Sequence, residues 1–250
     1  MGNKDIQKIR RIEARENNIR AFLRKVPRNL RGFNIVENLE QGSDFTYLSP
    51  DDKTVLAEYL EKPSPFLILS GGSGLGKSAT AIGLAFELMR RGYAMTAKYV
   101  STSILLNEFS FGDETEDRMR PLKKAIHPDI LILDDVSIGS TLSTETKSGT
   151  MQALIAKRWE EGKYTIITTD LKVETEKNED KERNEEEDDN RFTIQQWFGE
   201  ASWNKMSGKR KEDAPNMMHA HFSNDASTPL FKNNKKSSRK KKSFSKFSVI

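Results

Sequence analysis

Apolar positions along the chain occur in two patterns, unbroken runs and helical spacing, which follow one another. An unbroken apolar run over residues 66–69 predicts a buried strand. After a stretch of glycine and serine, the apolar positions adopt helical spacing and end at Gly92, a residue typical of a helix C-terminus. This helical face consists of Ala81, Ile82, Leu84, Ala85, Leu88 and Met89. The pattern therefore predicts a strand, a glycine-rich loop and a helix in direct succession.

The same alternation recurs further along the chain. The apolar run 130–133 predicts a central strand, which Asp134 and Asp135 follow directly. A later β-branched run, 164–168, predicts another strand, with Thr169 and Asp170 at its end. The helix expected between them ends at Gly162 and has one face made of Met151, Leu154, Ile155, Arg158 and Trp159. A chain of 250 residues with this pattern favours one α/β domain with appendages.

The loop after the first strand has the composition of a phosphate-binding loop. Its sequence GGSGLGKS fits G-x-x-x-x-G-K-[ST], in which backbone N–H groups surround phosphates and the lysine reaches the outer ones. The following helix N-terminus also favours an anion. We expect ATP here, with the lysine contacting the β- and γ-phosphates. The candidate nucleotide-binding residues are Gly71, Gly72, Ser73, Gly74, Leu75, Gly76, Lys77, Ser78 and Ala79.

Polar residues at the ends of the two later strands supply the remaining candidate chemistry. Open α/β sheets bind ligands at the carboxyl ends of their strands. Mg²⁺ prefers oxygen ligands, so we assign Ser78 and Asp134 to the metal. Asp135 is then suited to orienting or deprotonating the water that attacks ATP. If the strand at 164–168 lies between those at 66–69 and 130–133, Thr169 and Asp170 would face the γ-phosphate as sensors.

Composition excludes several classes of site. The chain has no cysteine, which excludes disulfides, thiolate catalysis and cysteine-based zinc modules. His219 and His221 are too few for a metal site without further ligands. No apolar run approaches the ~20 residues of a membrane span, and the N-terminus lacks a hydrophobic signal core. We expect a soluble, cytoplasmic protein with no membrane segment.

The net charge of +4 conceals blocks of opposite sign. Residues 1–31 carry ten basic and three acidic side chains, residues 172–190 ten acidic and four basic, and residues 232–246 eight basic and no acidic ones. Basic ends favour a polyanionic partner, above all nucleic acid, although a solvated tail explains the last block equally well. We divide the chain into a basic helical extension (1–31), a nucleotide-binding domain (32–222) with a disordered acidic insert (172–190), and a disordered basic tail (223–250).

The N-terminal extension has an amphipathic, arginine-rich helical pattern. Its apolar positions are Ile6, Ile9, Ile12, Ile19, Phe22 and Leu23. Such a helix either docks on a protein partner or packs against its own domain, and we favour the partner.

Five segments together resemble a known family. They are VPRNLRGF (26–33), GGSGLGKS (71–78), LILDD (131–135), AKRWEEGKYTIITTDL (156–171) and FGEASWNKMSG (198–208). In this order they resemble the DnaC/IstB-like branch of the AAA+ ATPases, over roughly residues 20–208. The resemblance implies a P-loop NTPase with a five-stranded parallel sheet, the sensor strand in its middle, flanked by helices. It further implies ATP, Mg²⁺, ATP-dependent homo-oligomers and an N-terminal partner-binding region.

The resemblance also implies a set of functions. The first is a DNA-replication ATPase that delivers a ring helicase to single-stranded DNA. The alternatives are a transposition helper ATPase acting on duplex DNA and a nucleotide-dependent adaptor with little turnover. Flanking genes or capture by a helicase or a transposase would distinguish the first two.

Three positions depart from the family pattern. Asp170 stands where the family commonly has asparagine after the sensor-strand serine or threonine. Lys205 stands where the family places an arginine finger that reaches a neighbouring subunit's ATP, and we expect Lys205 rather than Arg191 to hold that position. The segment after Gly208 differs from the usual final strand, although Met217, Met218 and Phe222 are suited to a short one.

Overall fold

The structure is a computed structural model that describes residues 3–41, 47–110, 119–137, 144–173, 193–208 and 216–223. The acidic run from 174 to 190 and the tail from 224 onward lie outside these residues, so the disordered insert and the disordered tail stay predictions.

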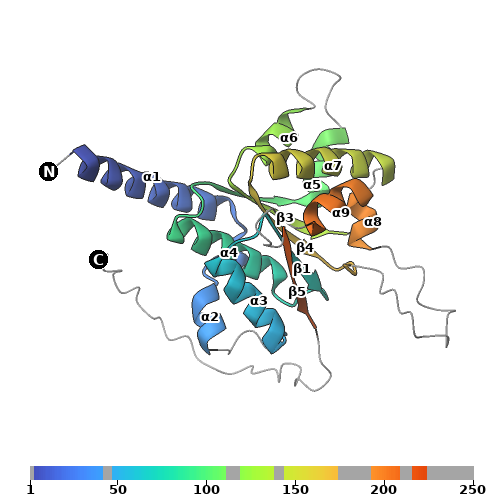
Figure 1. The fold of residues 1–250 in the computed structure, drawn as a ribbon, viewed down its shortest axis with the longest axis horizontal. Coiled ribbons are helices and arrows are strands. Elements are labelled where there is room, and N and C mark those ends of the chain that lie inside the picture. Colours follow the sequence, from blue (N-terminus) through green and yellow to red (C-terminus); the bar gives the residue numbers. More distant parts are fainter. Residues whose placement is uncertain are drawn as a thin grey trace.

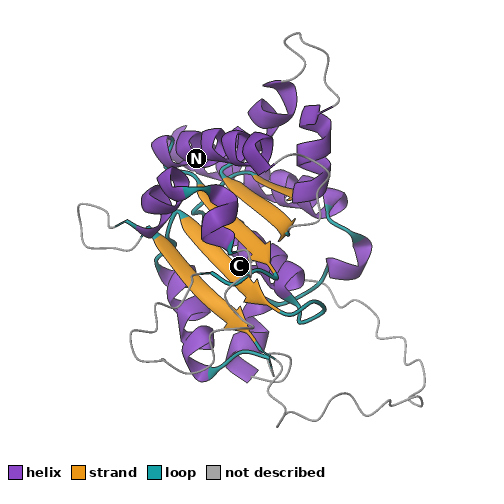
Figure 2. Cartoon of the chain, turned by 90° about the vertical axis from the view of Figure 1, so that its right-hand side faces the viewer, coloured by secondary structure: helices purple, strands orange, loops and turns teal. Residues whose placement is uncertain are grey.

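A five-stranded parallel sheet forms the centre of the protein (Figure 2). Its strands are β1 (Phe66–Gly71), β2 (Ala97–Ser101), β3 (Ile130–Val136), β4 (Tyr164–Thr169) and β5 (Met217–Phe222). Their order is β2-β3-β4-β1-β5, and each neighbouring pair is parallel. The predicted α/β class and five-stranded parallel sheet are confirmed. As expected, β4 lies between the phosphate-loop strand β1 and the acidic strand β3.

Helices cover both faces of the sheet (Figure 1). They are α1 (Asn3–Lys25), the 3₁₀ helix η1 (Arg28–Leu30), α2 (Ile35–Gln41), α3 (Pro50–Glu61), α4 (Lys77–Arg91), α5 (Thr102–Ser110), α6 (Met119–Ile126), α7 (Thr144–Glu160), α8 (Ile194–Phe198) and α9 (Glu200–Ser207). Gly92, in a left-handed conformation, caps α4 as predicted, because its N–H bonds back to the last turn.

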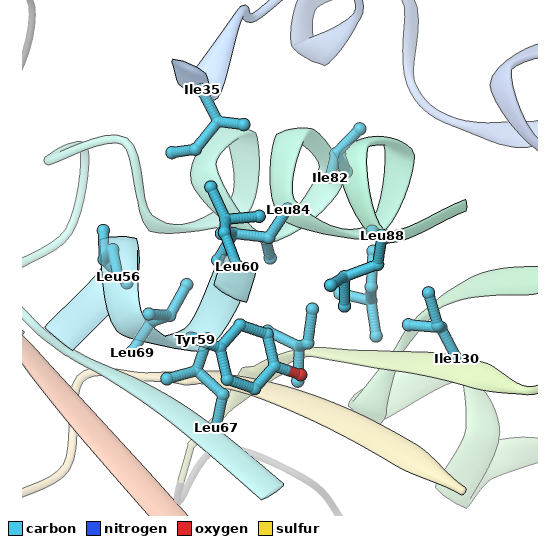
Figure 3. Packing of buried hydrophobic residues seen from close by; sticks show 14 of the residues in the cluster. Ile35, Leu56, Tyr59, Leu60, Leu67, Leu69, Ile82, Leu84, Leu88 and Ile130 are labelled. Carbon is cyan, nitrogen blue, oxygen red and sulfur yellow. The ribbon is translucent and has the colours of Figure 1, made fainter. Parts of the chain in front are cut away.

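The apolar core consists of two layers, one on each face of the sheet. Side chains alternate between the faces along each strand, so that Leu67 and Leu69 belong to one layer and Phe66 and Ile68 to the other. The first layer packs β-strand residues against α1 to α4, and Figure 3 shows Leu84 and Leu88 of α4 within it. The second layer is filled from α5 to α9. The result is a three-layer α/β/α arrangement.

The N-terminal helix belongs to this core only in part. Phe22 and Val26, at and just after its C-terminal end, are buried in the first layer. Ile6, Ile9 and Ile12 are 38–40% exposed, and Figure 1 shows the first turns of α1 extending beyond the rest of the fold. The helix therefore packs on its own domain at one end and leaves an apolar stripe exposed at the other.

No helix in the described part of the chain is long and apolar enough to cross a membrane.

Candidate nucleotide-binding site

The glycine-rich loop connects the carboxyl end of β1 to the first turn of α4. Gly71 has φ +125°, and a Cβ atom there would lie 2.0 Å from the carbonyl oxygen of Phe222 on β5. Gly76 caps the helix with φ +91°, and its carbonyl accepts the first helical hydrogen bond from Thr80. Only glycine tolerates both positions without strain, which explains two of the glycines in the motif. The loop therefore bends sharply and leaves the N-terminus of α4 open to a ligand.

Lys77 lies across this loop. Its Nζ donates to the carbonyl oxygens of Gly71 at 2.7 Å and Gly72 at 2.6 Å. Burial lowers the pKa of the ammonium, and three nearby carboxylates act in the opposite direction. These carboxylates belong to Asp170, Asp135 and Asp134. The lysine is thus held at the loop by weak neutral acceptors, which an anionic phosphate would replace with a stronger partner.

Asp134 is the most enclosed acidic group of the site, with 8% of its surface exposed. Its Oδ1 accepts hydrogen bonds from Ser78 Oγ at 2.6 Å and Thr168 Oγ1 at 2.7 Å. Its Oδ2 accepts from the hydroxyl of Tyr99 at 2.5 Å. The structure therefore brings Ser78 and Asp134 together across 56 positions of sequence, while their role as metal ligands stays a prediction.

The donor set fits magnesium. Among the described residues, no group of three or more His, Cys, Asp or Glu side chains is arranged to hold a metal alone. Mg²⁺ is commonly bound through one or two protein oxygens together with phosphates and waters, and Ser78 with Asp134 supplies such a pair beside the loop.

Asp135 has an unusual backbone. Among the described residues it is the one non-glycine with positive φ, at 59°. The register between β3 and β4 shifts between Leu133 and Val136, so the chain bulges at this residue. The bulge turns the carboxylate out into solvent, and its backbone N–H donates to Thr168 Oγ1 at 2.9 Å. Partial desolvation, then repulsion from the carboxylates of Asp134 and Asp170, raises its pKa.

The end of β4 differs in detail from the sequence assignment. Thr169 donates to the carbonyl oxygen of Val136 at 2.6 Å and accepts from the N–H of Leu171, so its hydroxyl is used within the fold. Thr168, which the sequence analysis did not select, bonds both residues of the acidic pair. Asp170 is exposed and influences the pKa of Lys77. Strand alternation was the available signal, because Thr168 shares the face of Ile166 that α4 covers.

Tyr99 is a second residue that sequence reasoning missed. No phosphate-loop or acidic-strand motif includes it, and only the pairing of β2 with β3 places its hydroxyl at Asp134.

Lys205 lies on α9 and is partly exposed. Within the described residues its ammonium has no ion pair, and its backbone carbonyl accepts from Asn216 Nδ2 at 3.1 Å. Arg191 lies outside the described residues. The choice between them as the finger therefore stays a prediction.

The two histidines occupy β5, the short final strand that the sequence suggested. His219 Nε2 and His221 Nδ1 both bond Ser70 Oγ, at 2.7 and 2.9 Å. Burial, then the neighbouring ring, lowers the pKa of His219. Their shared partner is the hydroxyl of Ser70 at the end of β1, so the two rings join β5 to its neighbouring strand.

A family model described as IstB-like ATP binding protein matches residues 14–179. The chain belongs to this family. The match covers the phosphate loop, the acidic pair and Thr168, and it confirms the resemblance expected from the sequence. No curated protein sequence gives a significant match.

Several solved structures match part of the chain at low identity. The replication initiator DnaA bound to AMPPCP and single-stranded DNA is 20% identical, with 53% of this chain and 41% of that chain covered and a TM-score of 0.43. DnaI is 17% identical, with 58% and 73% covered and a TM-score of 0.44. The DnaC helicase loader is 18% identical, with 59% and 82% covered and a TM-score of 0.43. The chain spans about two fifths of the length of the DnaA structure.

Proposed function

We propose that this protein binds ATP with Mg²⁺ at the loop formed by residues 71–79, hydrolyses it, and uses the cycle to deliver a ring helicase to single-stranded DNA. The observation that carries the ATP-dependent part is the contact between Ser78 and Asp134 beside Lys77. Family membership supports the nucleotide. The helicase and DNA parts rest on the five sequence segments and on the basic, partly exposed N-terminal helix. We place the protein in the cytoplasm.

Binding is assigned to the loop and the start of α4. Backbone N–H groups of the loop would hold the phosphates, and Lys77 would leave its two carbonyl partners for the β- and γ-phosphates. Ser78 and Asp134 would hold Mg²⁺, which neutralises charge on the phosphates when bound.

Hydrolysis is assigned to the exposed half of the acidic pair. Asp135 lies at the bulge with its carboxylate in solvent, where it can reach a water, whereas Asp134 is enclosed by three hydroxyls. Thr168 donates to the Asp134 carboxylate and accepts from the backbone N–H of Asp135, and so holds the backbone of the bulge beside that carboxylate. Asp170 would respond to the γ-phosphate because it is electrostatically coupled to Lys77.

Assembly is assigned to α9. We propose an ATP-dependent homo-oligomer in which Lys205 reaches the nucleotide of the adjacent subunit. An ammonium lacks the two-point contact of a guanidinium, so Lys205→Arg should raise turnover only at protein concentrations that permit assembly, and Lys205→Ala should lower it. Superimposable curves of turnover against concentration for the three proteins would remove Lys205 from the mechanism.

A second candidate follows from the family itself. IstB-like proteins are the group whose model matches, and a transposition helper that acts on duplex DNA uses the same ATP site. A nucleotide-dependent adaptor is the third candidate, since Asp170 and Lys205 replace residues that the family uses for turnover.

One set of experiments separates the three candidates. Steady-state ATP hydrolysis is measured alone, with single-stranded DNA and with duplex DNA, and capture of a replicative helicase is compared with capture of a transposase in ATP. Lys77→Ala is the matched control for nucleotide-dependent capture. If the protein is a helicase loader, single-stranded DNA should stimulate ATP hydrolysis. The wild type should then capture the helicase, and Lys77→Ala should not. Duplex stimulation with transposase capture supports the second candidate, and capture without turnover supports the third.

A further inference from the structure

The carboxylate of Asp134 is held from both sides. Two hydroxyls, from Ser78 and Thr168, bond Oδ1. A single hydroxyl, from Tyr99, bonds Oδ2 at 2.5 Å. The three donors come from α4, β4 and β2, so each neighbouring element of the site contributes one.

Tyr99 reaches this position because of sheet register. It pairs with Ile132 on β3, two residues before Asp134, and Ser101 is the residue directly opposite Asp134. Residues two apart on a strand share a face, so Tyr99 and Asp134 point into the same layer, which α4 covers. The tyrosine ring packs against the first core layer, which fixes the direction of its hydroxyl toward the carboxylate.

We propose that Tyr99 is a positioning residue for the metal ligand Asp134, an inference that rests on the proposed magnesium site. The torsion that rotates a carboxylate is broad and poorly restrained by itself. With hydroxyls on Oδ1 alone, one oxygen only is restrained against rotation about the Cβ–Cγ bond. The bond to Oδ2 restrains the second oxygen and keeps Oδ1 facing Ser78, so the two metal ligands stay together before the ion arrives. Partners of metal ligands contribute roughly 10–100-fold to metal affinity in other proteins.

The effect of removing the hydroxyl is confined to magnesium. Among the described residues, the Tyr99 hydroxyl bonds Asp134, whereas the Lys77 ammonium bonds the carbonyls of Gly71 and Gly72, so the proposed phosphate contacts do not involve Tyr99. Tyr99→Phe keeps the ring in the core and removes one oxygen. Binding of ATP in the absence of Mg²⁺ should therefore stay within about twofold of wild type, while the Mg²⁺ concentration that gives half of the metal-dependent gain should rise about tenfold or more.

The matched control is Tyr93→Phe. Tyr93 lies just after α4, and its hydroxyl donates to the carbonyl oxygen of Glu61 at 2.5 Å, away from the acidic pair. Each protein is titrated with a fluorescent ATP analogue at several Mg²⁺ concentrations and in EDTA, and its thermal unfolding is followed in parallel. The inference expects a Mg²⁺ shift in Tyr99→Phe and none in Tyr93→Phe.

Three results would overturn the inference. Equal Mg²⁺ dependence of Tyr99→Phe and wild type would remove the positioning role and leave the proposed ATP site intact. Equal weakening with and without Mg²⁺ would show that Tyr99 supports the fold only. A wild-type protein whose ATP binding ignores Mg²⁺ would contradict the proposed magnesium site itself, and the role of Tyr99 with it.

Discussion

The two ends of the sheet each bury a charged side chain, and they treat it differently. At the carboxyl end, the Asp134 carboxylate is surrounded by three side-chain hydroxyls. At the amino end, Arg158 of α7 is fully buried, and its hydrogen bonds to described residues all go to uncharged oxygens. Its guanidinium donates to five backbone carbonyls and one hydroxyl, which belong to Ala125, Ile126, Pro128, Asp129, Tyr164 and Thr165.

The difference separates a site that can exchange partners from one that cannot. Hydroxyls rotate, so those around Asp134 can reorient when a cation arrives. Backbone carbonyls are fixed by the fold, so Arg158 ties the segment before β3 to the start of β4 permanently. Burial lowers the pKa of Arg158 to about 9, which still leaves the side chain charged at neutral pH. Burial of charge alone therefore does not distinguish the proposed metal site from a structural contact, whereas the ability of the partner groups to rotate does.

The largest expected effect is on stability at the amino end. Arg158→Met keeps an unbranched apolar stem and leaves several buried carbonyls without a donor, each worth about 1–3 kcal/mol. We expect the free energy of unfolding to fall by at least about 3 kcal/mol in chemical denaturation. Lys157→Met, one position away and half exposed, is the control and should change it by less than about 0.5 kcal/mol. Similar losses in both variants would contradict the structural role of Arg158.

Substitutions of Asp134 and Asp135 test the proposed chemistry at the carboxyl end of the sheet. Asp135→Asn should leave ATP binding within about twofold of wild type and slow hydrolysis by about 100-fold, because it removes a general base. Asp134→Asn should instead weaken Mg²⁺-dependent binding, since an amide is a poorer ligand for Mg²⁺. Equilibrium binding and single-turnover hydrolysis measure the two effects separately. Normal turnover of Asp135→Asn would show that the roles are assigned wrongly.

Lys77→Ala should reduce ATP affinity at least about tenfold, because it removes a charge-assisted contact of roughly 1.5–3 kcal/mol. Stability should change little, since the lysine bonds only the loop carbonyls. Isothermal titration calorimetry with ATP checks this prediction. Lys157→Ala, which changes an exposed lysine on α7, is the control. Unchanged affinity would mean that the loop binds no phosphate through this residue.

The smallest expected effects come from substitutions of the adjacent residues Thr168 and Thr169. Thr168→Val removes the hydroxyl shared by Asp134 and Asp135, so hydrolysis should slow by about fivefold, equivalent to roughly 1 kcal/mol. Thr169→Val removes a bond to the Val136 carbonyl, so unfolding should become easier by about 1 kcal/mol while turnover stays nearly unchanged. The reverse pattern would restore Thr169 as the sensor.

The parts of the fold that repeat a simple period could be predicted from the sequence. Residues 66–69 and 130–133 are unbroken apolar runs, and both lie in buried strands of the sheet. The phosphate loop and the acidic pair were found because each directly follows such a run. Their contact is explained by the parallel order of β1, β4 and β3.

The missed residues depend on contacts that no local pattern encodes. Tyr99 reaches Asp134 through the register of β2, which pattern analysis does not detect. Alternation along β4 places Thr168 on the correct face, but it does not reveal its hydrogen bonds to the acidic pair. Arg158 was assigned to a helix face with apolar neighbours, but its burial requires carbonyls from a segment about 30 residues earlier. Long-range hydrogen bonds of this kind follow from the assembled fold rather than from spacing.

The close approach of Gly71 to the Phe222 carbonyl affects the order in which the protein can form during synthesis. The first glycine of the phosphate loop packs against β5, and all of β1 is paired with that strand from Phe66 to Gly71. Both neighbours of β1 follow it in the sequence, and β5 at residues 217–222 is the later of the two, so one edge of β1 stays unpaired until the end of the domain is made. A nascent chain therefore gains a fully braced loop only once β5 has left the ribosome, and ATP binding would report the completion of the sheet.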